Sequence, residues 1–281
     1  MFSKPSAPSP DATTSTTRAP NDGASPPAFV ALVFALSVPF WIVGATTGLE
    51  LLPGLPVSAL QAAVPVMAAL VLVFRDSGSA GAVRLLARSA DFTCTAAKAW
   101  YVVALLLMPA IAVVAYAVMR VMGLPLPTPE IPWSAIPGMF LAFTVFGLAE
   151  ELGWSGYATD PLVARWGGVS AGMLLGLAWG AWHIVPLIQA RRAPDWIAGW
   201  YLGTVASRIV IVWLYERAGK SVVSATLYHA MSNICWQLFP NRGSHYDPRV
   251  TGVVTAFVAA IIVFAFEPRQ ARVPARRVGR A

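Results

Sequence analysis

The sequence predicts an all-α protein, a polytopic bundle of about eight transmembrane helices. The chain of 281 residues is 57% hydrophobic and only 12% charged, whereas soluble globular domains carry about 25% charged residues. Its mean hydropathy is +0.64. Apolar runs of about 18 or more residues recur along the chain, and roughly 20 helical residues are needed to cross a bilayer core of about 30 Å.

The chain divides into a tail, a membrane domain and a second tail. Residues 1–27 are rich in Pro, Ser, Thr and Ala without an apolar period, so we expect a disordered cytoplasmic tail. Residues 28–266 form the expected transmembrane domain, and 267–281 an arginine-rich cytoplasmic tail. The apolar runs that we interpret as spans cover residues 28–46, 57–74, 98–122, 132–154, 169–190, 196–215, 221–240 and 250–266.

Positive residues outside the spans are concentrated in the tails and in the loops that share a side with the N-terminus. Cytoplasmic loops of membrane proteins carry such an excess of Lys and Arg. The pattern predicts a multi-pass integral protein of a bacterial-type cell membrane, with both termini cytoplasmic and an even number of spans. It also explains the net charge of +7 without nucleic acid, so the predicted partner is the lipid bilayer.

Arg120 lies at the end of the third span, where its side chain can reach the outer interface. Five other ionisable residues lie deeper inside the predicted spans, where each one costs at least a few kcal/mol and is a functional candidate by default. They are Glu150 and Glu151 in the fourth span, His183 in the fifth, Arg208 in the sixth and His229 in the seventh. Successive helical residues point about 100° apart, so the two glutamates cannot face one spot. One could face a reaction centre while the other is held by a partner. The alternative is a helix end whose glutamates reach cytoplasmic water.

The fifth span carries a stripe of small residues, Gly172, Gly176 and Gly180, which allows another helix to approach closely. His183 lies on the same helical face, with Trp179 one turn before it. Considered alone, a histidine there would more often be a satisfied core residue.

The seventh span adds His229 and Asn233, four residues apart on one face. An imidazole and a carboxamide can donate two hydrogen bonds to one anionic oxygen. The alternative is a pair of residues that hydrogen-bond neighbouring helices together.

Taken together, these residues suit hydrolysis of an amide by water. One of the two glutamates would act as the general base in a water-poor cavity, and His183 would orient the water or protonate the leaving amine. His229 and Asn233 would hold the tetrahedral oxyanion. At 1.5 Å per residue, Glu150 and His229 lie roughly 6 to 12 Å from the cytoplasmic helix ends but His183 roughly 20 Å. Convergence therefore requires tilted helices or a late start of the fifth span.

Zinc remains open at this stage, because Glu150, His183 and His229 are of ligand type although no HExxH pair is present. Water bound to Zn²⁺ and water activated by glutamate alone are both compatible with the sequence. Ser155 is not expected to be a nucleophile. The nucleophile elbow of hydrolases has the pattern G-x-S-x-G after a strand. Here the second glycine is one position too early, in Gly153-Trp154-Ser155-Gly156-Tyr157, and no strand is expected before it.

The motifs EELGWSG, WGAWH and HAMSN together resemble the CPBP family of intramembrane proteases, also called the CAAX protease and bacteriocin-processing or abortive-infection family. The resemblance covers about residues 132–240. It implies an intramembrane endopeptidase with its active site within the bilayer, open to the cytoplasmic side, and a peptide or lipid-modified protein as substrate. By the same resemblance Glu150 activates water, Glu151 accompanies it, His183 is the second-motif histidine, and His229 and Asn233 form the oxyanion pair. The family is often labelled metalloprotease, which keeps Zn²⁺ as a possible cofactor.

The sequence departs from the family pattern at Ser155, where the first motif has an arginine. On a helix, residue 155 shares a face with Glu151, so an arginine there would form an ion pair with it. Our hypothesis is that Arg208 of the sixth span supplies the missing positive charge.

Two other function classes compete with the protease. A non-catalytic immunity or scaffold protein could keep the fold with a decayed site, and the missing arginine favours this interpretation. A transporter could use buried Glu and His as proton relays. However, the halves of the chain show no hydropathy repeat of the kind found in repeat-built transporters.

Overall fold

The computed structural model describes residues 24–52, 55–92 and 98–266 of the chain; the predicted tail 267–281 and most of the tail 1–27 lie outside these ranges. The long helices are α1 (Pro26–Thr47), α2 (Val64–Ala87), α3 (Lys98–Val121), α4 (Ile136–Gly153), α6 (Gly168–Gln189), α7 (Pro194–Arg217), α8 (Val222–Leu238) and α9 (Pro248–Phe266). The shorter elements are β1 (Glu50–Leu52), β2 (Leu55–Pro56), the 3₁₀ segments η1 (Val57–Ala63) and η2 (Arg88–Ala90), the π-helical η4 (Trp154–Thr159) and α5 (Asp160–Trp166).

The predicted class, a polytopic helical bundle, is confirmed. In the described ranges, seven helical segments are long and apolar enough to cross a membrane, so the chain is a multi-pass membrane protein. The eighth predicted span is also helical, but α8 has only 17 residues and carries several polar side chains. It packs mainly against α3, α4 and α7. A polar helix is tolerated in a membrane protein where protein rather than lipid surrounds it.

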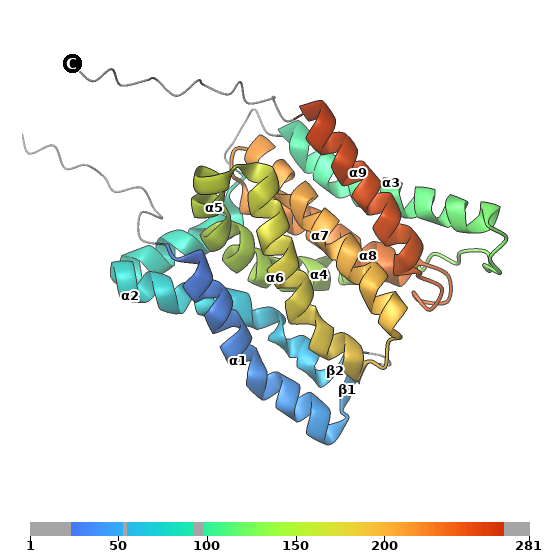
Figure 1. The fold of residues 1–281 in the computed structure, drawn as a ribbon, viewed down its shortest axis with the longest axis horizontal. Coiled ribbons are helices and arrows are strands. Elements are labelled where there is room, and N and C mark those ends of the chain that lie inside the picture. The colour runs from blue at the N-terminus through green and yellow to red at the C-terminus, as the bar shows by residue number, and fades with distance from the viewer. Residues whose placement is uncertain (1–23, 53–54, 93–97, 267–281) are drawn as a thin grey trace, which may run out of the picture.

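The helices that carry the candidate residues pack directly on one another. The most extensive contacts join α6 to α7, α7 to α9, α4 to α8 and α3 to α8. In Figure 1, α6, α7 and α8 occupy the middle of the bundle, with α1 and α2 to one side and α3 and α9 to the other. This arrangement brings the three sequence motifs into one region.

The glycine stripe of α6 packs on α7. An added Cβ would lie 2.8 Å from the Ile209 Cα at Gly172 and 2.9 Å from the Val205 Cα at Gly176. Any side chain at these positions would therefore push the α7 backbone away. A second close approach, between Gly252 of α9 and the backbone of Gly199 in α7, was not anticipated from the sequence.

The fourth span is longer than the sequence predicted. It begins at Ile136 and does not end at residue 154, because a π-helical turn and α5 continue it to Trp166. The chain then reverses at Gly167, which has a φ of 80°. Hydropathy marked where the apolar run ended but not where the helix ended.

This extra length removes the depth mismatch expected between Glu150 and His183. Glu150 lies 16 residues before Trp166, and His183 lies 15 residues after Gly168, on the two helical segments that meet at the Gly167 reversal. At 1.5 Å per residue both are roughly 22 to 24 Å from that turn. The two side chains are therefore at comparable levels in the bundle.

The α6–α7 contact can be tested with Gly176→Ala. The added methyl group meets the Val205 backbone, with its carbonyl oxygen at 3.1 Å, so we expect a loss of about 1–3 kcal/mol in stability. The measurement is the midpoint of thermal unfolding in detergent. Gly138→Ala in α4 is the matched control, because an added Cβ there meets nothing within 4 Å. Equal midpoints for the two variants would contradict the packing argument.

Candidate active site

Glu150 and Glu151, in the last turn of α4, are both buried but have different partners. Glu150 is 6% exposed and Glu151 is fully buried. The Glu150 Oε2 atom accepts a hydrogen bond of 2.7 Å from Trp179 Nε1 of α6. Glu151 instead contacts α7 and α8, as the 100° offset between successive helical residues requires. The structure therefore excludes the alternative in which both glutamates reach water at a helix end.

Both carboxylate oxygens of Glu151 are occupied by protein donors. Arg208 Nη1 lies 2.7 Å from Oε2, in an ion pair whose two side chains have no exposed surface. Ser155 Oγ donates to the same oxygen, and His229 Nδ1 lies 3.0 Å from Oε1. A carboxylate with three donors, one of them a guanidinium, is stabilised in its charged form and has little capacity left to activate a water molecule.

Ser155 thus lies beside Glu151, one turn away, where the family arginine would lie. Its hydroxyl hydrogen bond supplies no charge, and Arg208 supplies the charge from another helix. No imidazole donates to or accepts from Ser155 within the described residues, so the geometry gives no support to a nucleophilic serine.

Arg208 is held by its ring contacts as well as by its ion pair. Its guanidinium carbon lies 4.2 Å from the centroid of the Trp179 ring, a distance typical of a cation–π interaction. Among the described residues, its Nε and Nη2 atoms have no hydrogen-bond partner. The charge of Arg208 is therefore directed to Glu151 and to the aromatic face.

Trp179 connects most of the candidate residues. Its indole Nε1 binds Glu150, its carbonyl oxygen lies 2.9 Å from His183 Nδ1, and its ring centroid is 5.2 Å from that of His229. The sequence identified Trp179 only as the residue one turn before His183. In the structure, His183, His229 and Arg208 all pack against the Trp179 ring.

The hydrogen-bond partners determine the proton positions on the two histidines. A backbone carbonyl can only accept, so His183 Nδ1 carries the hydrogen, and when the ring is neutral its Nε2 atom presents a lone pair. Glu151 likewise accepts from Nδ1 of His229. Nε2 of His229 can therefore donate only when the ring is doubly protonated. In that state the two negative charges of Glu150 and Glu151 would be balanced by the positive charges of Arg208 and the His229 imidazolium.

Asn233 follows His229 by one turn of α8 and is half-buried. Its carboxamide makes no hydrogen bond with the described residues, so its donors are available to a bound group. Glu150 is close enough to interact electrostatically with both His183 and His229. Glu150, Glu151, His183 and His229 therefore lie in one cluster built from α4, α6 and α8, with Arg208 from α7.

The zinc alternative has no ligand set in this geometry. Within the described residues, no three His, Cys, Asp or Glu side chains are grouped so that they could hold a metal ion. Glu151 and Nδ1 of both histidines are already engaged in hydrogen bonds. We therefore derive no step through a metal.

Two residues of the surroundings were missed from the sequence. The Trp200 ring of α7 lies 5.0 Å from the His183 ring, and Arg88 donates from Nη1 to the carbonyl of Gly156 in the π-helical turn. The chain has 11 tryptophans, and nothing in the pattern distinguished Trp200 from the others. Arg88 resembled an ordinary loop arginine.

The Glu151–Arg208 pair can be tested with Arg208→Met. Removing one member of a buried ion pair leaves an uncompensated charge and costs about 3–5 kcal/mol, so we expect a large fall in the thermal midpoint in detergent. Arg165→Met is the control, because Arg165 is exposed on α5 and stacks on Trp166.

A second variant separates charge from side-chain volume. Ser155→Arg combined with Arg208→Met restores a guanidinium one turn from Glu151, and we expect it to recover at least half of the lost stability. If Arg208→Met is no more harmful than Arg165→Met, or if the double variant is worse than Arg208→Met alone, Arg208 does not replace the motif arginine.

Comparison with known proteins gives two matches. Residues 132–235 match the family described as type II CAAX prenyl endopeptidase Rce1-like, and this range contains the three motifs. The curated protein CAAX prenyl protease 2 of Methanococcus maripaludis is 31% identical over 140 residues, which are 46% of this chain and 50% of the relative. The match thus spans about half the length of that relative. These findings confirm the resemblance inferred from the motifs.

Proposed function

We propose that the chain, whose residues 132–235 match the family described as type II CAAX prenyl endopeptidase Rce1-like, is an intramembrane endopeptidase of the CPBP family that hydrolyses a peptide bond with water activated by Glu150. The proposal rests on the different hydrogen-bond and ion-pair partners of the two glutamates. Glu151 is paired with Arg208, whereas Glu150 forms no salt bridge with Arg or Lys in the part of the chain that the structure describes, and accepts one hydrogen bond, from Trp179. Its second carboxylate oxygen remains available to a water molecule.

The proposed reaction uses those atoms of the cluster that make no hydrogen bond to the described residues. Glu150 takes a proton from water while the Nε2 lone pair of His183 orients that water, and the water oxygen attacks the peptide carbonyl carbon. The Nε2 atom of doubly protonated His229 and the carboxamide of Asn233 donate hydrogen bonds to the oxyanion that forms. The C–N bond then breaks, the proton held by Glu150 passes to the leaving nitrogen, and an acid and an amine are released.

The substrate that we propose is a peptide or a lipid-modified protein that reaches the site from the bilayer. The relative from Methanococcus maripaludis is named a CAAX prenyl protease, so a peptide with a prenylated cysteine near its C-terminus is the first probe. The scissile bond must enter a site whose Glu150 and His229 are only 6% and 5% exposed. Access from lipid, with the peptide near the membrane surface, is compatible with that burial.

A non-catalytic immunity or scaffold protein on the same fold is the second candidate. Its only specific support is Ser155 in place of the motif arginine. The contact between Arg208 and Glu151 weakens this argument, because the charge missing at position 155 is supplied from α7.

The role of Glu150 is tested with Glu150→Gln in purified protein in detergent, using a quenched prenylated peptide and a peptide library. The amide oxygen of Gln can still accept from Trp179, so the change removes the base and keeps its position. We expect the rate of cleavage to fall at least about 100-fold. Glu130→Gln, an exposed loop position, is the control. Wild-type cleavage by Glu150→Gln, or full biological activity of both Glu150→Gln and His229→Ala in cells, would refute catalysis.

The oxyanion role is tested with Asn233→Ala. A donor that acts mainly in the transition state affects kcat more than KM, and its loss costs about 10²–10³-fold in kcat. Gln237→Ala removes an exposed carboxamide one turn later on the same helix and should leave kcat nearly unchanged. A change in KM alone would assign Asn233 to substrate binding instead.

A further inference from the structure

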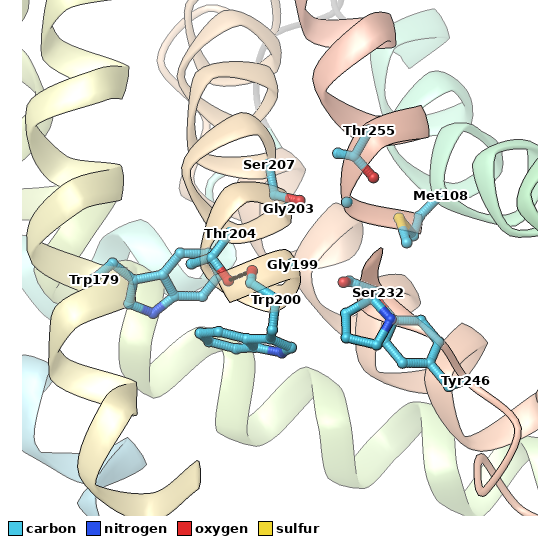
Figure 2. A pocket seen from close by; sticks show the side chains of 12 residues that line it. Met108, Trp179, Gly199, Trp200, Gly203, Thr204, Ser207, Ser232, Tyr246 and Thr255 are labelled. Carbon is cyan, nitrogen blue, oxygen red and sulfur yellow. Dashed lines mark hydrogen bonds between the residues drawn. The ribbon is translucent and has the colours of Figure 1, made fainter. Parts of the chain in front are cut away.

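A cavity lies next to the candidate active site, between α7 and α9, with walls from α3, α6 and α8. Its volume is about 40 Å³, and a single water requires about 10–15 Å³. Figure 2 shows the side chains around it, among which the hydroxyl-bearing residues are Thr204, Ser207, Ser232, Tyr246 and Thr255. Cavities that stay dry are apolar, whereas cavities with several polar partners hold water.

The hydroxyl groups of this cavity have free hydrogen-bonding capacity. Thr204 Oγ1 donates to the Trp200 carbonyl and Thr255 Oγ1 to the Thr251 carbonyl, at 2.9 and 2.7 Å. Each oxygen therefore keeps its lone pairs as acceptors. Burial raises the pKa of Tyr246 to about 12, so its hydroxyl keeps its proton at neutral pH. The cavity thus offers both donors and acceptors to a small polar molecule.

The cavity adjoins the candidate active site through shared tryptophan side chains. Trp179 and Trp200 form part of its wall, and the centroids of their rings lie 5.5 and 5.0 Å from that of His183. Ser207 and Ser232 immediately precede Arg208 and Asn233 in the chain. From there the lining continues to Tyr246 and Pro248, in the connection between α8 and α9.

Hydrolysis consumes one water molecule per bond, yet the candidate base is almost completely enclosed. We propose that this cavity, which we name the hydroxyl cavity, holds a short chain of water and supplies the hydrolytic water to the His183 side of the site from the α8–α9 end of the bundle. The supply role rests on the proposed function; the presence of water does not.

The presence of water is tested by cysteine labelling, which needs no proteolytic activity. Ser232→Cys and Thr204→Cys are made in a chain with Cys94→Ser and Cys235→Ser, and are treated with a small charged methanethiosulfonate reagent in detergent. We expect both to be modified at least about tenfold faster than Thr226→Cys, because only an ionised thiolate in contact with water reacts. Thr226 is the matched control, since it is buried on α8 and is not part of the lining. Equal rates would overturn the proposal.

The supply role is tested with Thr204→Val and Thr255→Val, which keep the side-chain shape and remove the hydroxyl. Loss of a bridging hydrogen bond corresponds to about a tenfold fall in kcat, while Thr226→Val should cleave at the wild-type rate. Labelling of the cavity with unchanged kcat in both variants would show a wet cavity that does not feed the reaction. If wild-type protein cleaves no peptide, the supply role fails with the proposed function, and the labelling still decides whether water enters.

Discussion

The buried ion pair between Glu151 and Arg208 is the interaction on which the rest of the site depends. It joins α4 to α7, and through the second carboxylate oxygen it extends to His229 on α8. Neither charge could remain in an apolar bundle alone, because an isolated buried ion costs far more than a folded protein can tolerate. The pair therefore determines how these three helices fit together, and it fixes the hydrogen of His229 on Nδ1.

Neutralising one glutamate has consequences for the other. With Glu151 committed to Arg208, the negative charge available for chemistry is that of Glu150, which is oriented by the Trp179 indole. Trp179 also fixes the hydrogen of His183 on Nδ1 and packs against the His229 ring. A single aromatic side chain thus sets the orientation of Glu150, the proposed base, and the surroundings of both imidazoles. The two adjacent carboxylates acquire separate roles because their neighbours differ, not because their chemistry does.

Part of this site was accessible from the sequence for a specific physical reason. Ionisable side chains are so costly in apolar helices that Glu150, Glu151, His183 and His229 could be identified one by one. Arg208 was identified by the same argument, and its pairing with Glu151 was proposed because the resembled family has an arginine where this chain has Ser155. Trp200 and the hydroxyl cavity could not be found this way. Tryptophan and threonine are inexpensive in a membrane helix, so nothing in the sequence separates those that line a site from those that fill space.

The sequence by itself determined which segments are apolar enough to be membrane spans and which faces of their helices carry polar groups. A bilayer requires long apolar segments, and helical periodicity fixes the angle of each side chain around its own axis. Only the tertiary structure decided how the helices are offset along their axes. The continuation of the fourth span to Trp166 brought Glu150 to the level of His183, and the hydrogen-bond partners assigned the imidazole protons. Periodicity carries no information about axial offset, because the contacts between helices set it.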